Sequence, residues 1–209
     1  MRDRTWRWLC LGLSNLARLG FDPPAIDAVV LSHSHDDHTG GLMGLLGAGA
    51  RAAVYVPAAF PASFKDGVRA RTDLVEISGP SEILPGLYTT GGVDAGLAGA
   101  GIIEQALAVE TGDGLAVVTG CAHPGVVEMV RRAQEAAGGE VALVVGGSHL
   151  GGAGQAQIER IITDLRSLGV QRVALCHCTG ERAQEMFATA FGADFLPAGV
   201  GWTITLSVR

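Results

Sequence analysis

A short apolar run at residues 29–31 leads directly into six residues that hold three histidines and two aspartates, His33-Ser34-His35-Asp36-Asp37-His38. Imidazole and carboxylate are the ligands that zinc, manganese and iron prefer when coordination positions stay open for chemistry. Side chains two positions apart in an extended segment point the same way, so we expect His33 and His35 to share one metal. Asp37 and His38 then turn toward a second metal. A solvated polar loop is the alternative, and it gives no reason for so many ligands in one place.

Each of the other three histidines also follows an apolar, strand-like run. The runs are residues 115–119, 141–145 and 172–175, which lead to His123, His149 and His177 respectively. Sheets of α/β proteins place their ligands beyond the carboxyl ends of the strands. Any one of these histidines alone could equally be a structural residue. Six of six at predicted strand ends favour one shared site.

The elements that must position these residues alternate along the chain. Short apolar runs typical of strands alternate with segments whose apolar residues recur at helical spacing, and this alternation predicts an α/β layered domain. A connection rich in glycine at 91–101 is either a flexible lid or a poorly ordered loop. We expect further strands at 28–32, 53–57, 74–77 and 86–90, with a turn between the last two, and helices at 11–19, 40–49, 124–137, 155–168 and 181–191.

The composition limits both architecture and partners. A chain of 209 residues with 48% hydrophobic residues and 31 glycines fits one domain over residues 1–209. The net charge of −6 and the single lysine, Lys65, argue against a nucleic-acid partner. No apolar run is long enough for a membrane span. The start faintly resembles a signal peptide, but its apolar part is short and interrupted and no small-x-small cleavage site follows, so we do not expect secretion. The cysteines, Cys10, Cys121, Cys176 and Cys178, are expected to be reduced thiols of a cytoplasmic protein.

The His-x-His-x-Asp-His motif at residues 33–38 resembles the signature of the metallo-β-lactamase superfamily. Three further motifs, at 119–125, 146–150 and 177–180, resemble one branch of it, which includes the dihydropterin–ribofuranosylaminobenzene phosphate synthase of methanopterin biosynthesis. The likeness spans roughly residues 11–206 and implies an αββα sandwich. The superfamily normally begins with several strands before the first helix, so we expect a sandwich shortened at the N-terminus. Its exposed edge strand would favour a homodimer.

The resemblance also implies a ligand set for two divalent metals, most simply two zinc ions, with manganese or iron as alternatives. One metal would be bound by His33, His35 and His123, and the other by Asp37, His38 and His177. Most members carry a bridging aspartate where this chain has Cys121. That thiol either bridges the metals as a thiolate or is a small buried residue, and both interpretations stay open. Cys176 and Cys178 flank His177, so at most one of them faces the metals.

Catalysis is expected to involve Asp37 and His149. Asp37 would take part as a ligand of the metal. His149 would act as a general acid or donate a hydrogen bond to the substrate, or else it would orient a metal ligand. A metal-activated water would serve hydrolysis of a small ester, lactone or phosphodiester, whereas the synthase displaces pyrophosphate. The prediction is a metal-dependent hydrolase or transferase for a small, phosphorylated or ester substrate. A non-catalytic metal-binding protein is the alternative, and the charge disfavours a nucleic-acid hydrolase.

Overall fold

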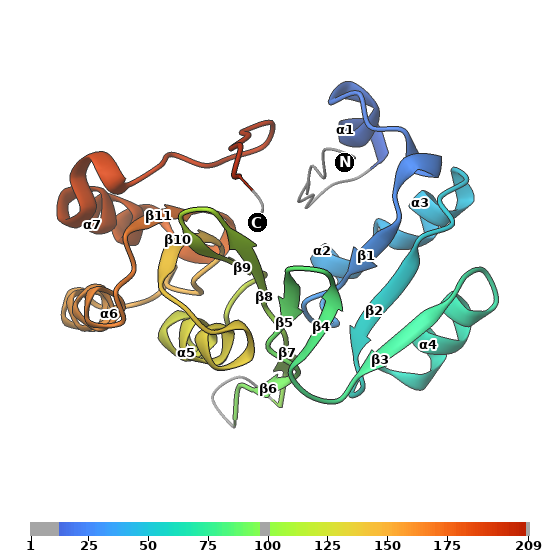
Figure 1. The fold of residues 1–209 in the computed structure, drawn as a ribbon, viewed down its shortest axis with the longest axis horizontal. Coiled ribbons are helices and arrows are strands. Elements are labelled where there is room, and N and C mark those ends of the chain that lie inside the picture. Colours follow the sequence, from blue (N-terminus) through green and yellow to red (C-terminus); the bar gives the residue numbers. More distant parts are fainter. Residues whose placement is uncertain (1–12, 97–100, 208–209) are drawn as a thin grey trace. The chain divides into compact units, whose positions relative to one another are not determined.

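The computed structural model describes residues 13–96 and 101–207 (Figure 1). The chain divides into two compact units, residues 1–77 and 78–209. The single domain expected from the sequence therefore stays a prediction. Cys10 and the first two residues of the expected helix 11–19 lie outside the described residues.

The first unit is built on a parallel sheet of three strands in the order β1-β2-β3. Val54 and Val56 of the central strand are fully buried, and Val68 of the last helix covers them. The three strands and the helices at 13–18 and 42–47 agree with the sequence predictions, whereas the helices at 36–39 and 62–69 were not predicted. Gly20, at φ +72°, lies just after the first helix. The elements are α1 (Leu13–Arg18), a 3₁₀ turn (Pro23–Ala25), β1 (Ala28–Val30), α2 (Asp36–Thr39), α3 (Leu42–Gly47), β2 (Ala53–Pro57), α4 (Ala62–Arg69) and β3 (Leu74–Ile77).

The second unit contains a mixed sheet of six strands in the order β11-β10-β9-β8-β5-β4. Three neighbouring strands, β9, β10 and β11, run parallel, whereas β8, β5 and β4 are antiparallel. The carboxyl ends of the three parallel strands, β9, β10 and β11, therefore meet at one edge of the sheet. The strands are β4 (Ser81–Leu84), β5 (Leu87–Thr89), β8 (Leu107–Thr111), β9 (Gly114–Thr119), β10 (Val141–Gly146) and β11 (Arg172–Leu175).

Strand β4 corrects the sequence interpretation, which expected only a turn between 77 and 86. Residues 81–84 form the outer arm of a hairpin with β5, and Gly86 completes the turn at φ +75°. The arm is exposed or only partly buried along its length, so it lacks the apolar run that marks a buried strand. Its identity depends on pairing with β5 and not on its own composition.

Three helices, α5 (Val126–Ala137), α6 (Gln155–Ser167) and α7 (Glu181–Phe191), pack against this sheet (Figure 1). Each contributes a large side chain that is fully buried, namely Met129, Ile158 and Phe187. Side chains of β8, β9, β10 and β11 complete the same apolar core. This core holds the carboxyl ends of the parallel strands in fixed register.

The connection predicted at 91–101 contains a short strand, β6 (Val93–Asp94), which pairs antiparallel with β7 (Ile103–Glu104) just beyond it. Residues 97–100 lie outside the described residues, so the choice between a lid and a disordered loop stays open. The pairing fixes the position of Glu104, a fully buried carboxylate. Glu104 accepts hydrogen bonds from the backbone of residues 121–123, which follow β9.

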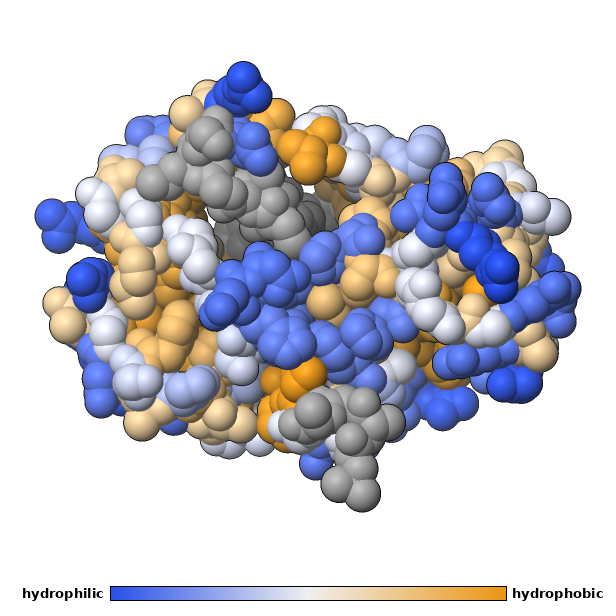
Figure 2. Space-filling view, turned by 180° about the vertical axis from the view of Figure 1, so that it is seen from behind, coloured by the Kyte–Doolittle hydropathy of each residue, from blue (hydrophilic) through white to orange (hydrophobic). Residues whose placement is uncertain are grey.

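On the face drawn in Figure 2, strongly hydrophobic residues occur in small groups between hydrophilic ones. Among the described residues, Val75 and Val200 are the large hydrophobic side chains that are exposed. No helix in the described part of the chain combines the length and hydrophobicity needed to cross a membrane. The homodimer expected from the sequence stays a prediction.

Gly146 ends β10 in a conformation that requires glycine. Its φ is +124°, and an added Cβ would lie 2.2 Å from the carbonyl oxygen of Thr119. We expect Gly146→Ala to lower the free energy of unfolding by about 3 kcal/mol, because it adds both backbone strain and a steric clash. Urea denaturation measures the loss. Gly152→Ala is the control, because a Cβ there meets nothing within 4 Å, and an equal loss in both variants would contradict the prediction.

Candidate metal site

The histidine segment of the first unit begins as a loop after β1 and continues into the short helix α2. The carbonyl of His35 accepts hydrogen bonds from the backbone N–H groups of His38 and Thr39, both at 3.0 Å. It also accepts one from the Thr39 hydroxyl at 3.1 Å. These bonds fold the second half of the motif back over the first half. The local sequence thus fixes the relative positions of its ligand groups.

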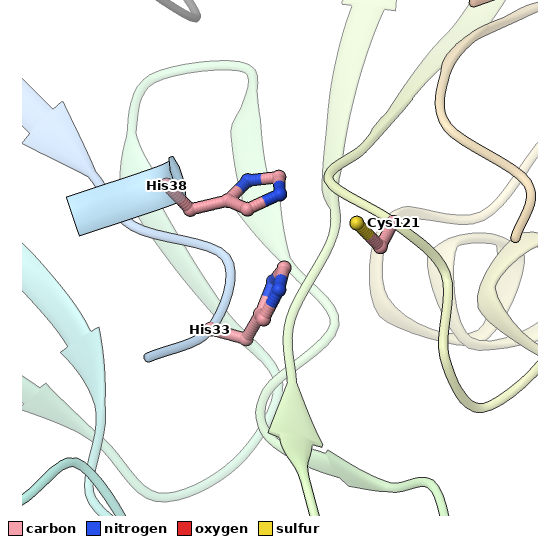
Figure 3. A group of neighbouring side chains, drawn as sticks. All are labelled: His33, His38 and Cys121. Atoms are coloured by element: carbon pink, nitrogen blue, oxygen red, sulfur yellow. The ribbon is translucent and has the colours of Figure 1, made fainter. Parts of the chain in front are cut away.

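The side chains of the motif converge. His33 Nε2 lies 3.1 Å from His35 Nδ1, and the rings of His33 and His38 are 4.1 Å apart between centroids (Figure 3). Asp37 Oδ2 lies 3.3 Å from His38 Nε2. His33 is completely buried, and its Nδ1 is in a hydrogen bond of 3.0 Å with Ser32 Oγ. This arrangement leaves the Nε2 atom of His33 directed at the other ligand groups.

The spacing of these nitrogens suits a divalent cation. Two imidazole nitrogens bound to a tetrahedral metal at about 2.0–2.1 Å lie roughly 3.3 Å apart. The nitrogens of His33 and His35 are 3.1 Å apart, so their rings need little movement to bind one metal. The donor set of imidazoles and a carboxylate, with one imidazole buried and oriented by a hydroxyl, therefore fits such an ion.

The second unit brings together the histidines that follow its parallel strands. His123 follows β9 and His149 follows β10, and their rings lie 4.4 Å apart between centroids. His177 follows β11. Ala122, His149 and His177 have φ values of 59°, 52° and 55°, a region that residues other than glycine seldom adopt. Such strain persists only where the surrounding structure enforces it, as at functional sites.

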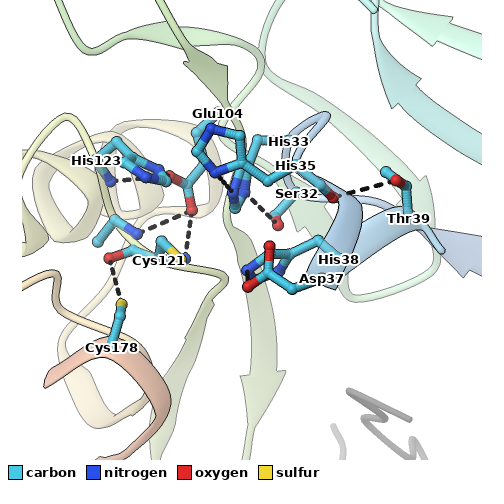
Figure 4. A network of polar contacts seen from close by, with 11 residues as sticks. Ser32, His33, His35, Asp37, His38, Thr39, Glu104, Cys121, His123 and Cys178 are labelled. Atoms are coloured by element: carbon cyan, nitrogen blue, oxygen red, sulfur yellow. Dashed lines mark hydrogen bonds and ion pairs between the residues drawn. The ribbon is translucent and has the colours of Figure 1, made fainter. Parts of the chain in front are cut away.

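A buried carboxylate organises the segment that carries His123. Glu104 Oε1 accepts from the backbone N–H groups of Cys121 and Ala122, at 2.8 and 2.9 Å (Figure 4). Its Oε2 accepts from the N–H group of His123 at 2.8 Å and lies 2.8 Å from that residue's Nδ1. Since an ionised carboxylate only accepts, Nδ1 of His123 carries the proton. Nε2 then presents its lone pair, as in the carboxylate–histidine pairs of metal sites.

Sequence reasoning missed Glu104. Its partners lie 17–19 residues further along the chain, so no local spacing connects them. The available signal was a charged residue within an otherwise mostly apolar stretch, residues 102–109. A fully buried carboxylate requires partners of this kind, because an uncompensated charge in the interior is strongly destabilising.

Cys121 belongs to this segment and Cys178 contacts it, and none of the three described cysteines forms a disulfide. The Cys178 thiol donates to the Cys121 carbonyl oxygen at 3.5 Å. A hydrogen bond with the Cys121 side chain is the main cause that lowers the pKa of Cys178 from 9.0 to about 5. Contacts with the backbone and ring of His149 and the charge of His177 lower this pKa further, and partial burial opposes them. Cys178, not Cys176, is thus the cysteine turned toward Cys121 and His149.

A pair of buried hydroxyls joins the loops after β10 and β11. Ser148 donates to Thr179 Oγ1 at 3.0 Å, and Thr179 donates to the Cys176 carbonyl at 2.7 Å. We expect Thr179→Val to destabilise the protein by about 1–3 kcal/mol, because the buried Ser148 hydroxyl loses its acceptor, although the Cys176 carbonyl keeps its bond from the backbone N–H of residue 179. Urea denaturation tests this result. Thr163→Val, which removes an exposed bond within α6, should change stability by no more than about 0.5 kcal/mol, and the prediction is wrong if the two variants are alike.

The α/β architecture and the convergent histidine motif together define a class of protein. Residues 2–165 match the family model of the metallo-β-lactamase superfamily, and the chain belongs to that superfamily. Its fold is accordingly the metallo-β-lactamase fold, as the sequence predicted.

Individual relatives agree with this assignment. The 7,8-dihydropterin-6-methyl-4-(beta-D-ribofuranosyl)-aminobenzene-5'-phosphate synthase of Methanocaldococcus jannaschii is 32% identical over 224 residues, which cover 88% of this chain and 76% of the synthase. The crystal structure of a metal-dependent hydrolase of the beta-lactamase superfamily has a TM-score of 0.77 and 27% identity, covering 93% of this chain and 84% of that one. A metallo hydrolase from Ignicoccus hospitalis shares the fold, with a TM-score of 0.55, 17% identity, and 88% and 80% covered. The predicted resemblance to the synthase branch is confirmed.

The structure thus groups the predicted site residues within each unit. The first unit brings together His33, His35, Asp37 and His38, and the second places Cys121, His123 and His149 together, with His177 after the neighbouring strand. The division of these residues between two metals stays a prediction. So do the catalytic roles of Asp37 and His149.

Proposed function

We propose that this protein is a metal-dependent hydrolase for a small phosphate ester or carboxylic ester. The observation that carries the proposal is the pairing of Glu104 with His123, which prepares one imidazole nitrogen for a metal. The convergent nitrogens of His33 and His35 support it independently. Membership of the metallo-β-lactamase superfamily and the hydrolases among its solved relatives agree with it.

We propose two divalent metals, bound by the ligands that the sequence predicted. His33, His35 and His123 would bind one, and Asp37, His38 and His177 the other. Zinc suits imidazole and carboxylate ligands and retains an open coordination position at catalytic sites. Manganese and iron would accept the same donors.

When bound, the metals supply a water of lowered pKa and polarise an oxygen of the substrate. The residues of the chain prepare this chemistry. Glu104 keeps the proton on Nδ1 of His123 and so fixes the ring that binds through Nε2. Asp37 holds a carboxylate beside His38, and its largely exposed side chain is accessible to a substrate.

Hydrolysis of an aryl phosphodiester by the metal-loaded protein tests the proposal. We expect turnover by the wild type and a loss of more than about 100-fold in His35→Ala, because a ligand is removed. Ser34→Ala is the matched control at the exposed position between two ligands, and it should retain activity. Equal activity, or equal inactivity, of wild type and His35→Ala at full metal loading would contradict the proposal.

A transferase is the second candidate, favoured by the name of the M. jannaschii relative, a phosphate synthase. In that case the same site would direct a bound acceptor instead of water to a phosphorylated substrate. A wild type that binds metal but hydrolyses no ester would favour this candidate if an acceptor formed a bond to the carbon of a pterin diphosphate ester while the C–O bond broke and pyrophosphate left.

A further inference from the structure

A second group of metal-binding atoms lies entirely within residues 78–209. Cys121, His149 and Cys178 each offer one ligand atom, and the three atoms lie within 4.8 Å of one another. The three residues follow β9, β10 and β11, which are adjacent parallel strands. Two thiols and one imidazole form a softer donor set than the histidines and aspartate of the first unit.

The surrounding backbone is arranged to bring these groups together. The N–H group of Cys121 is held by the buried carboxylate of Glu104 at 2.8 Å. Cys178 lies in a 3₁₀ turn, His177–Thr179, and its sulfur reaches the carbonyl of Cys121. At Gly147 a Cβ would lie 2.7 Å from the Cys178 sulfur and 2.4 Å from the Gly120 carbonyl. Only glycine at this position leaves room for the sulfur.

We propose that Cys121, His149 and Cys178 bind a thiophilic cation, zinc in the simplest case, at a site separate from the two metals of the proposed function. In tetrahedral zinc, with bonds of about 2.3 Å to sulfur and 2.0–2.1 Å to nitrogen, ligand atoms lie roughly 3.6–3.8 Å apart. The group observed here needs an adjustment of about 1 Å or less to reach that geometry. Three protein ligands leave a fourth position for water or another small ligand.

The assignment changes the roles of two residues. Cys121 becomes a ligand of this site instead of the bridging thiolate or small buried residue expected from the sequence. His149 binds the cation in place of acting as a general acid. The site uses none of the histidines at 33–38, so its occupancy is independent of the first unit's ligands.

Cobalt(II) is the probe, because thiolate-bound cobalt absorbs in the near ultraviolet by charge transfer whereas imidazole- and carboxylate-bound cobalt does not. Metal-free full-length protein is titrated with cobalt under reducing conditions, and circular dichroism verifies that each variant is folded. We expect a band of two-thiolate intensity in the wild type. Cys178→Ser and Cys121→Ser should each lose half of the band or more, and His149→Ala should shift the visible d–d absorption.

Two controls separate this site from the proposed function. Cys176→Ser, which removes the cysteine two positions before Cys178, should retain the full band. His33→Ala, which removes a ligand of the proposed catalytic metals, should also retain it. A full band in folded Cys178→Ser, or loss of the band in His33→Ala, would overturn the separate site. A protein that shows the full thiolate band but hydrolyses no ester would support the separate site and contradict the proposed hydrolase function alone.

Discussion

Replacing Glu104 by glutamine should both destabilise the protein and weaken metal binding. The carboxylate is fully buried and accepts from three consecutive backbone N–H groups and from His123 Nδ1. An amide has one acceptor oxygen in place of two, so its NH₂ group would face N–H donors. We expect a loss of about 3–5 kcal/mol in the free energy of unfolding, as for other broken buried charge networks. Urea denaturation measures it.

The same substitution should lower metal affinity by about 10–100-fold, since His123 loses the partner that fixes its tautomer. Competition with a chelator of known affinity gives this number. Glu140→Gln is the matched control, because Glu140 is exposed on the same unit. A Glu104→Gln protein with the stability and metal affinity of Glu140→Gln would refute the role given to the buried carboxylate.

Replacing Asp37 by asparagine should remove one metal and most of the activity. Asp37 Oδ2 lies 3.3 Å from His38 Nε2, where a carboxylate and an imidazole can bind one ion together. A neutral amide is a much poorer ligand for a divalent cation. We expect the metal content to fall by one equivalent and ester hydrolysis to fall by more than about 100-fold. Elemental mass spectrometry and a steady-state assay measure the two effects.

Asp36→Asn is a closely matched control. Asp36 and Asp37 are neighbours in the first turn of α2, so both substitutions remove the same charge from the same end of the helix. Asp36 occupies the variable position of the motif and is exposed. We expect Asp36→Asn to retain both metals and to stay within about threefold of wild-type activity. Similar losses in the two variants would mean that charge alone, and not a ligand at position 37, determines activity.

The histidines were predictable because their signals are local. His33, His35 and His38 lie within one segment, and each later histidine comes within four residues of the end of an apolar run. Periodicity alone also located the helices α5, α6 and α7. The pattern of strands ending in histidine was enough to predict that β9, β10 and β11 bring side chains to one edge.

Other features depend on tertiary structure and left little trace in the sequence. Glu104 gains its role from amides 17–19 residues away. Strand β4 is a strand only because β5 pairs with it. The direction of the Cys178 sulfur is set by a 3₁₀ turn that begins at His177 with φ 55°, and by the missing Cβ of Gly147. Spacing in the sequence encodes none of these relations directly.

We propose that the predicted histidines and Asp37 bind two catalytic metals. Elemental mass spectrometry of freshly purified Cys178→Ser protein tests it most directly, because this variant lacks the proposed thiolate site and reports on the remaining ligands alone. We predict two equivalents of divalent metal per chain, falling to about one in the additional variant Asp37→Asn. A folded Cys178→Ser protein that contains no bound metal, even after incubation with zinc, would contradict the claim.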